Sequence, residues 1–554
     1  MRLSPRACNV LMIYPRFGAG TFWNFAAACE LFGAKYPTAP LGLITVAALL
    51  PREWTIRLVD RNTEALTDGD LNWADMVMTG GMLPQYFDTI EIVEMCRARG
   101  TPVVVGGPGV TSIPYGYSKA NFRVLGEAEG VIDQFIAAWE SGAREGVFEA
   151  EKFKIDVTKS PVPRFDLLKV EHYLYIGVQF SRGCPFTCEF CDIIELYGRV
   201  PRAKTNAQML RELETLYRLG YRGHVDFVDD NLIGNKKAVK AFLPDLKAWL
   251  EQHDHPFEFT TEASLNLADD ADLMKLMSEA NFIGVFVGIE SPDADTLVAM
   301  RKKQNTRRNI AQSIHRIYAA GLYVTAGFII GFDSEQGSVA DALIELIEEA
   351  AIPICMVGLL FALPNTQLTR RLAREGRLHA ELLSAPEAAI DQATQGLNFD
   401  TVRPREEILS DFKRVLENVY DPAAYAKRLQ RLAGLLGRSN RNRRASADDS
   451  RSRIDALGIV HRILSNLPQG QEVFRQTIIR CASTNPQWAR TIVMLMAFYL
   501  HLGPFSQQVI RRIEQQLEEL RTAAPGARGP ISRPALPERL GDVLTVATST
   551  GGNA

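Results

Sequence analysis

The sequence predicts an α/β protein in which two parallel-sheet domains precede a helical domain. Short apolar segments alternate with helix-like segments over residues 1–145 and again over 173–365, and this alternation is typical of parallel sheets covered by helices. Residues 366–520 carry amphipathic helical patterns without further strand-like segments. The chain has 554 residues, 46% of them hydrophobic and 23% charged, so it has the length and composition of a multidomain globular protein.

The first sheet domain contains five strand-like segments, at residues 9–14, 54–60, 75–80, 102–106 and 122–126, with helices at 41–50, 86–99 and 128–139. Ligands of such sheets bind at the carboxyl ends of the strands, where glycine lets the backbone approach a ligand closely. The candidate binding residues at these ends are Asp60, Asn62, Gly80, Gly81, Met82, Gly106, Gly107, Gly126 and Glu127. They predict a site for a large ligand; the alternative is a Rossmann-like domain that binds nothing.

A linker is expected over 146–172, and six strand–helix units follow. The strands are predicted at 175–181, 223–228, 257–263, 282–289, 322–330 and 353–362. Six units indicate a partial (βα)6 barrel, whose active site lies at the carboxyl ends of its strands. The polar residues at those ends are Asp229, Asp230, Glu262, Ser264, Asn266, Glu290 and Ser291. Some, such as Asp230 or Ser291, have the alternative role of helix N-caps.

Three cysteines, Cys184, Cys188 and Cys191, stand at the spacing C-x3-C-x2-C on a loop after the first barrel strand. Three thiolates on one loop can bind three irons of a 4Fe–4S cube and leave the fourth open to a substrate, since thiolates suit iron–sulfur clusters. The alternatives are a zinc knuckle or buried free thiols. Zinc takes four ligands, and the sequence has no second cysteine pair or Cys/His cluster. The other five cysteines are scattered and expected to be buried.

The C-terminal region predicts helices at 406–420, 423–436, 454–464, 472–482, 487–502 and 506–521. An apolar face at helical spacing is expected to pack in a core, with membrane docking or a wall for an apolar substrate as the alternative; it comprises Trp488, Ile492, Leu495, Met496 and Tyr499. Residues 437–453 are expected to be exposed or mobile, and 521–554 to form a disordered tail.

Net charge and hydropathy limit the partners and the cellular location that the sequence indicates. The formal net charge is −3, so no overall basic field indicates nucleic acid. No signal peptide is evident, and the apolar runs are shorter than the roughly 20 residues that span a bilayer. We expect a cytoplasmic protein, with peripheral contact to the inner membrane as an alternative. The basic segment from Lys302 to Asn305 is expected on a solvated surface, with the edge of a phosphate-bearing cofactor as the alternative.

Several motifs of residues 8–400 together resemble the cobalamin-dependent radical S-adenosylmethionine (SAM) methyltransferases, most closely the hopanoid 2-methylase type. The motifs are Tyr14-Pro-Arg-Phe17, Phe22-Trp-Asn24, Ala39-Pro-Leu-Gly-Leu-Ile-Thr-Val-Ala47, Val178-Gln-Phe-Ser-Arg-Gly-Cys184, His224-Val-Asp-Phe-Val-Asp-Asp-Asn231 and Leu363-Pro-Asn-Thr-Gln367. The resemblance implies that residues 1–145 bind cobalamin and that the cysteines hold a 4Fe–4S cluster whose open iron binds SAM. It places Asp229 and Asp230 at the SAM amino group. It places Glu262, Ser264 and Asn266 at the ribose or carboxylate, and Glu290 with Ser291 on the ribose and adenine side.

The resemblance also implies an activity: methylation of an unactivated carbon, C-2 of a hopanoid-type lipid in the nearest type. One SAM would supply the methyl group through cobalamin, and a second would start radical chemistry with an electron from a flavodoxin or ferredoxin. No histidine precedes His172, so the first domain has no histidine ligand for cobalt, unlike proteins with an Asp-x-His-x-x-Gly motif. The alternatives are another substrate, a non-methylating outcome such as ring formation, and a non-catalytic cobalamin or redox sensor.

Overall fold

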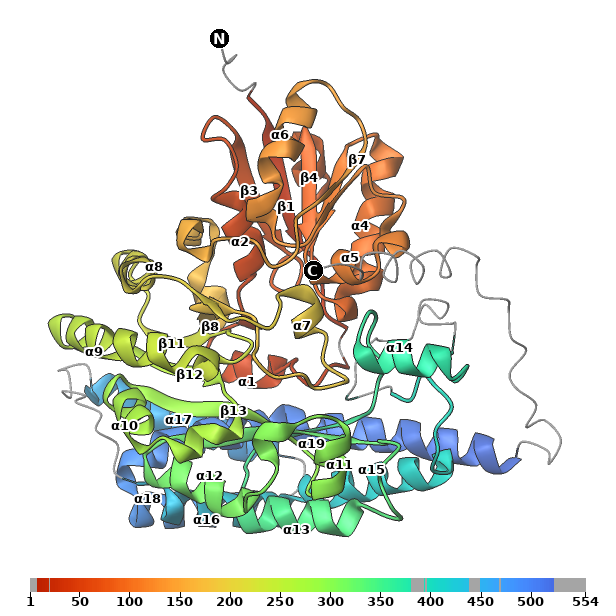
Figure 1. Ribbon diagram of the computed structural model, residues 1–554. Coiled ribbons are helices and arrows are strands. Elements are labelled where there is room, and N and C mark those ends of the chain that lie inside the picture. Colours follow the sequence, from red (N-terminus) through yellow and green to blue (C-terminus); the bar gives the residue numbers. More distant parts are fainter. Residues whose placement is uncertain are drawn as a thin grey trace.

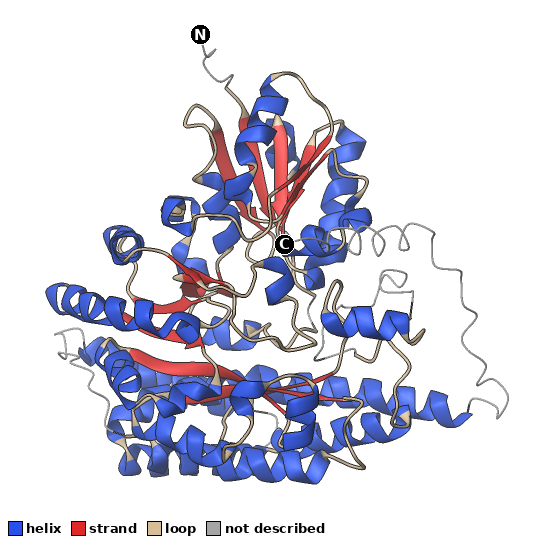
Figure 2. Ribbon diagram, in the orientation of Figure 1, coloured by secondary structure: helices blue, strands red, loops and turns tan. Residues whose placement is uncertain are grey.

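The computed structural model describes residues 7–18, 20–379, 393, 396–437, 449–467 and 470–522. It has three parts: a parallel sheet with helices on both faces, a parallel half-barrel beneath it, and a layer of long helices below the half-barrel (Figure 1). Figure 2 shows the two sheets as separate groups of strands. The fold class is therefore the predicted one. Residues 438–448 of the predicted mobile segment and 523–554 of the predicted tail lie outside the described residues.

The N-terminal sheet has six parallel strands in the order β3-β1-β4-β5-β6-β7. The strands are β1 (Asn9–Tyr14), β3 (Thr55–Asp60), β4 (Met76–Gly80), β5 (Val103–Gly106), β6 (Phe122–Leu125) and β7 (Gly146–Glu149). The helices are α2 (Leu41–Ala47), α3 (Asp68–Trp73), α4 (Tyr86–Arg99), α5 (Pro108–Ser112) and α6 (Ile132–Glu140). All five predicted strands are present, and β7 extends the sheet into the segment that we predicted to be a linker.

The half-barrel has seven parallel strands in the order β15-β14-β13-β12-β11-β8-β2. The six predicted strands are β8 (Tyr173–Val178), β11 (Gly223–Phe227), β12 (Phe257–Glu262), β13 (Phe282–Glu290), β14 (Tyr323–Ile330) and β15 (Cys355–Leu359). The helices that follow them are α8 (Asn206–Arg218), α9 (Lys236–Gln252), α10 (Ala271–Glu279), α11 (Ala294–Ala299), α12 (Ile310–Ala319) and α13 (Ala340–Ala350).

The seventh barrel strand, β2 (Tyr36–Thr38), was not predicted. It pairs with β8, with Tyr36 opposite Tyr173, although it comes from the chain segment that we assigned to the first domain. Helix α1 (Ala26–Leu31) precedes it, and Phe25 packs on Phe498 of the C-terminal region with ring centroids 4.7 Å apart. The segment before α2 thus crosses from the first sheet to the half-barrel, where β2 forms the edge strand next to β8.

The C-terminal helices share the hydrophobic core of the half-barrel, and all but the first of them lie on its outside (Figure 1). They are α14 (Gln367–Arg374), α15 (Arg405–Val419), α16 (Pro422–Leu435), α17 (Asp449–Asn466), α18 (Gln471–Thr484) and α19 (Ala489–Thr522). Two predicted helices are in fact one, because α19 continues through Pro504; proline removes a single helical hydrogen bond, and the neighbouring Leu502 and Phe505 are buried.

The predicted apolar face of residues 488–499 is buried, with Trp488 and Leu495 fully inaccessible. The prediction that this face packs in a core is therefore confirmed. No helix among the described residues has the length and apolarity to span a membrane.

Candidate active site

The loop that carries the three cysteines follows β8 and is closed at its base by a two-stranded ribbon. Strand β9 (Ser181–Arg182) pairs antiparallel with β10 (Arg202–Ala203). Gly183 has a φ of +98°, and a Cβ there would lie 2.9 Å from the carbonyl oxygen of Gly198, so only glycine fits this turn. All three cysteines are free thiols; Cys188 is buried, and Cys184 and Cys191 are half-buried.

The surroundings of the thiols fit an iron–sulfur cluster. The amide nitrogens of Asn231 and Gln304 lie 3.8 Å from the sulfurs of Cys184 and Cys188, and N–H groups directed at the sulfurs tune such clusters. Burial raises the pKa of all three thiols, so thiolates here need a cationic partner. Among the described residues, no three His, Cys, Asp or Glu side chains are grouped as one metal ion requires. A 4Fe–4S cluster binds each thiolate through a different iron, so the three sulfurs need not converge on one metal ion.

Asp229 and Asp230, at the end of β11, hold the backbone of the cysteine loop. The carboxylate of Asp229 accepts hydrogen bonds from the backbone nitrogens of Phe180, at 2.9 Å, and Ser181, at 2.5 Å. Asp230 accepts one from the backbone nitrogen of Gly183 at 2.8 Å. Burial raises the pKa of Asp229 to about 7 and that of Asp230 to about 6. Both residues are thus placed at the cysteine loop, where their contacts position its backbone.

Ser264 and Asn266, after β12, join Asn231 in one hydrogen-bonded chain. The Ser264 hydroxyl lies 3.1 Å from the amide nitrogen of Asn231 and 2.6 Å from the side-chain oxygen of Asn266. Since Asn231 also contacts Cys184, the chain links the predicted SAM residues of β12 directly to the cysteine loop. The structure therefore brings these three side chains together.

Glu262 and Asp226 face the same side of the half-barrel sheet from adjacent strands. One Glu262 carboxylate oxygen, Oε2, is buried and has no hydrogen-bond partner among the described residues. Burial, reinforced by the charge of Asp226, raises the pKa of Glu262 well above its usual value. Burial also raises the pKa of Asp226, which accepts a hydrogen bond from Thr260 at 2.5 Å. Asp226 was not singled out from the sequence, because a carboxylate inside a strand carries no distinguishing pattern.

Glu290, at the end of β13, forms a buried ion pair with Lys302 at 2.6 Å. Glu290 has a left-handed backbone with φ +69°, and the Lys302 nitrogen lies 5.9 Å from the ring centroid of Phe190 in the cysteine loop. The expectation that Lys302 lies on a solvated surface is therefore wrong, because its charge is paired next to the cysteines. Ser291 is buried and accepts a hydrogen bond from the backbone nitrogen of Asp293, which caps α11.

The glycines at the carboxyl edge of the N-terminal sheet form a narrow backbone cradle. A Cβ on Gly80 would lie 2.4 Å from the carbonyl oxygen of Gly106. Gly107 and Gly126 have φ values of +91° and +78°, which favour glycine. Gly81 lies under the Gln85 side chain, and Met82 is 48% exposed beside it. Backbone without side chains at adjacent strand ends fits a large flat ligand such as a corrin.

Asp60 and Asn62, in contrast, are engaged by the protein itself. Asp60 accepts hydrogen bonds from the Asn62 amide at 2.8 Å and from the Tyr173 hydroxyl at 2.9 Å. Asn62 in turn binds the backbone of the loop at Pro15 and Phe17. Burial raises the pKa of Asp60. These two residues connect the first sheet to β8 of the half-barrel.

A group of four charged residues, which we call the domain clamp, joins the two carboxyl edges: Glu127, Glu129, Arg182 and Arg202. Arg182 binds Glu127 at 3.0 Å and Glu129 at 2.8 Å, and Arg202 binds Glu127 at 2.9 Å. The Glu127 side chain is only 4% exposed, and those of Arg182 and Arg202 are 12% and 15% exposed. Glu127 was predicted as a cofactor residue, and the structure places it against the base of the cysteine loop. The two arginines lie in the β-ribbon, and no sequence signal marks their partners.

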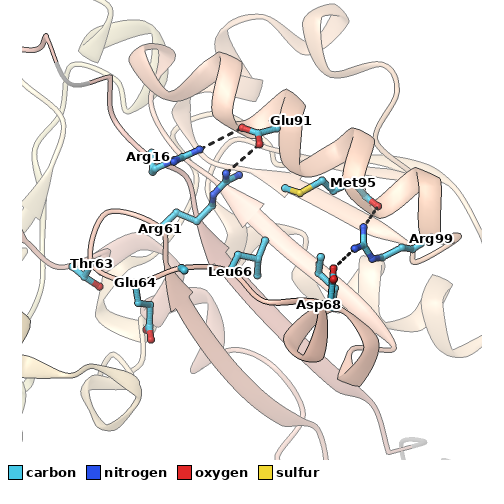
Figure 3. A pocket seen from close by; sticks show the side chains of 11 residues that line it. Arg16, Arg61, Thr63, Glu64, Leu66, Asp68, Glu91, Met95 and Arg99 are labelled. Carbon is cyan, nitrogen blue, oxygen red and sulfur yellow. Dashed lines mark hydrogen bonds and ion pairs between the residues drawn. The ribbon is translucent and has the colours of Figure 1, made fainter.

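A cavity of about 600 Å³ opens beside the N-terminal sheet, between α4 and the loop before α3. Charged side chains pair across it, with Arg61 lying 3.3 Å from Glu91 and Arg99 bonded to Asp68 (Figure 3). It is therefore a polar cavity of the first domain, and neither the predicted glycines nor the three cysteines line it.

Comparisons with known proteins agree with this geometry. Residues 178–347 match the radical SAM superfamily, and residues 366–515 match a domain of unknown function, DUF4070. An uncharacterized methyltransferase of Synechocystis sp. is 47% identical over 77% of this chain and 79% of its own. The hopanoid C-2 methylase of Rhodopseudomonas palustris is 36% identical over 76% and 78%. The radical SAM methyltransferase TsrM of Kitasatospora setae, solved with cobalamin and a [4Fe-4S] cluster, has a TM-score of 0.58 at 15% identity and covers 76% of this chain and 95% of its own.

The fold and the cysteine loop define a radical SAM enzyme. The chain belongs to the radical SAM methyltransferase family that includes the hopanoid C-2 methylase.

Proposed function

We propose that this protein transfers a methyl group from SAM to an unactivated carbon, with a 4Fe–4S cluster at Cys184, Cys188 and Cys191 and a cobalamin on the glycine cradle. The observation that carries the proposal is the placement of the two sites. The domain clamp ties the loop after β6, beside the cradle, to the base of the cysteine loop at 2.8–3.1 Å. Two cofactors held there would face one substrate position.

The cofactors, when bound, supply methyl transfer and radical generation, and the protein supplies binding, orientation and exclusion of competing reactions. Asp229 and Asp230 fix the loop that holds the cluster. Ser264 and Asn266 present polar atoms beside Cys184 through Asn231, as binding of the amino-acid part of SAM requires. Glu290, oriented by Lys302, presents a carboxylate suited to ribose hydroxyls.

The proposed substrate is a hopanoid-type lipid methylated at C-2, with the similarity to the Rhodopseudomonas palustris enzyme as support. The proposed electron donor is a flavodoxin or ferredoxin, and the proposed location is the cytoplasm or the inner face of the membrane. A second cobalamin-dependent outcome, such as ring formation, would leave the SAM methyl group out of the product.

The test is anaerobic reconstitution with iron, sulfide and cobalamin, followed by turnover with methyl-labelled SAM, a hopene-type lipid and reduced flavodoxin as the electron donor. We expect labelled 2-methylhopanoid and 5′-deoxyadenosine. Cys188→Ala should lose the iron–sulfide absorbance and both products, whereas Cys355→Ala, at a buried cysteine in the half-barrel core, should keep them. 5′-Deoxyadenosine without labelled lipid would indicate another substrate or outcome, and neither product in the parent protein would contradict an enzymatic role.

A further inference from the structure

Exposed basic residues gather on two segments next to the cysteine loop. Residues 300–310 contain five basic residues and no acidic one, and residues 367–377 contain four basic residues and one acidic one. The chain as a whole has 62 basic and 65 acidic residues, so the local excess is a departure from its balance. We call the exposed members of these segments the basic surface: Arg301, Lys303, Arg307, Arg370 and Arg374.

The two segments form one continuous surface. The guanidinium of Arg301 binds the side-chain oxygen of Gln367 at 2.6 Å, and Gln367 is the first residue of α14. Lys303 and Arg307 form no ion pair with a described residue, and Arg370 stays 44% exposed while it binds Glu195. Val298, 62% exposed on α11, adds an apolar contact near Arg301.

Both segments touch the cysteine loop directly. The backbone nitrogen of Glu189 donates to the carbonyl of Met300 at 3.0 Å, and the carbonyl of Glu189 accepts from Leu368 at 2.9 Å. Gln304, next to Lys303 in sequence, contacts the Cys188 sulfur at 3.8 Å. Arg301, Lys303 and Arg370 are therefore only one or two residues along the chain from groups that touch Cys188 or Glu189.

Backbone strain supports a functional surface. Arg301 and Arg307 have φ values of +63° and +59°, a left-handed conformation that costs a non-glycine residue energy and that clusters at functional sites. The two residues flank the 3₁₀ turn Lys303–Asn305, in which Gln304 and Asn305 are buried and Lys303 is exposed. The strained turn directs polar groups to the cysteines on one side and positive charge to solvent on the other.

We propose that the basic surface is the docking site of the acidic one-electron carrier that reduces the cluster, an inference that rests on the proposed function. One electron passes from the reduced flavin or iron–sulfur centre of the carrier to the cluster, and no atom is transferred. Electron-transfer complexes use small interfaces, and charge complementarity sets their association rate and their sensitivity to salt. The acidic neighbours Asp293, Asp295 and Glu375 lower the local positive charge without reversing it.

The test reverses charge on both segments with Lys303→Glu and Arg374→Glu in one variant. The matched control is Arg52→Glu with Lys275→Glu, which makes the same charge change at exposed sites on the first domain and on α10. Binding of a reduced flavodoxin to the cluster-free proteins is measured by calorimetry at low salt. Formation of 5′-deoxyadenosine by the loaded proteins is measured with flavodoxin and, separately, with dithionite.

We expect the double reversal to weaken flavodoxin binding at least tenfold and to slow flavodoxin-driven 5′-deoxyadenosine formation by a similar factor, with the dithionite-driven rate unchanged. Equal affinity in the test and control variants would overturn the proposal, as would an equal loss with both reductants. Loss of binding to phosphatidylglycerol vesicles with flavodoxin affinity intact would assign the surface to anionic lipid instead. If the parent protein forms no 5′-deoxyadenosine with dithionite, the proposed function fails, while the binding measurement still decides the docking site.

Discussion

The carboxyl edges of the N-terminal sheet and of the half-barrel present different chemical groups. At the N-terminal sheet the strands end in glycines, and a Cβ on Gly80 would meet the backbone of Gly106 at 2.4 Å. At the half-barrel the strands end in buried polar side chains, with Asp229 1% and Glu290 6% exposed. The first edge presents backbone, and the second presents carboxylates, amides and thiols.

This difference corresponds to the ligands that we propose. A large flat ligand needs room for its face and gains contact from backbone that approaches closely. A small charged ligand needs a few precisely placed donors and acceptors that a dry environment strengthens. The domain clamp connects the two edges, because Glu127 lies at the edge of the N-terminal sheet and its arginine partners lie at the edge of the half-barrel.

Breaking the domain clamp should have the largest effect on stability. Glu127→Gln removes the negative charge that Arg182 and Arg202 share, and leaves the largely buried Arg202 without a carboxylate partner among the described residues, while Arg182 keeps Glu129. We expect a loss of about 3 kcal/mol in the free energy of unfolding, the magnitude for breaking a buried ion pair on one side. Denaturant unfolding of the cofactor-free protein measures it.

The control is Glu94→Gln, which breaks the solvent-exposed pair of Glu94 with Lys119. Exposed pairs contribute little, so the unfolding midpoint should stay close to that of the parent protein. Equal effects of the two substitutions would show that the clamp does not hold the domains together.

The glycine edge is tested by Gly80→Ala, whose methyl group would be forced against the backbone of β5. We expect a loss of about 2 kcal/mol in stability from overpacking and at least tenfold weaker cobalamin binding, measured by titration of the absorbance spectrum. Gly69→Ala is the control, because its Cβ would meet only Thr67 at an ordinary 3.6 Å. Normal cobalamin affinity in Gly80→Ala would remove the evidence for a backbone cradle.

The fold could be predicted from the sequence where the hydrophobic pattern is local. The alternation of apolar strands and helices located the five predicted strands of the first sheet and six strands of the half-barrel. Strand β2 has only three residues, and its partner β8 lies far along the chain, so no periodicity marks it. Helix α19 was divided at Pro504 because a proline usually ends a helix, and packing on both sides of Pro504 decided otherwise.

The candidate site was predicted as a set of residues but not as a set of contacts. The cysteine spacing marks a loop, and carboxylates after strands mark an edge, so Asp229, Asp230 and the three cysteines came together as expected. Their partners did not follow from the pattern. Gln304 reaches Cys188 across 116 residues of sequence, and the pairing of Glu127 with Arg182 depends on how two domains meet. Such tertiary pairings have no local signal.

The last prediction concerns the polar edge and depends on pH. Burial raises the pKa of Asp229 to about 7, whereas an aspartate in the unfolded chain titrates near about 3.9. The folded protein therefore binds this proton more tightly, and the resulting stabilisation is complete below about pH 4 and lost as the pH rises to about 7. In the cofactor-free protein, unfolding free energies at pH 5, 6, 7 and 8 should fall less steeply for Asp229→Asn than for the parent. Asp272→Asn, at an exposed position on α10, should keep the parental slope. Parallel profiles for all three proteins would mean that Asp229 is ionised throughout, and that the half-barrel edge is wetter than its burial indicates.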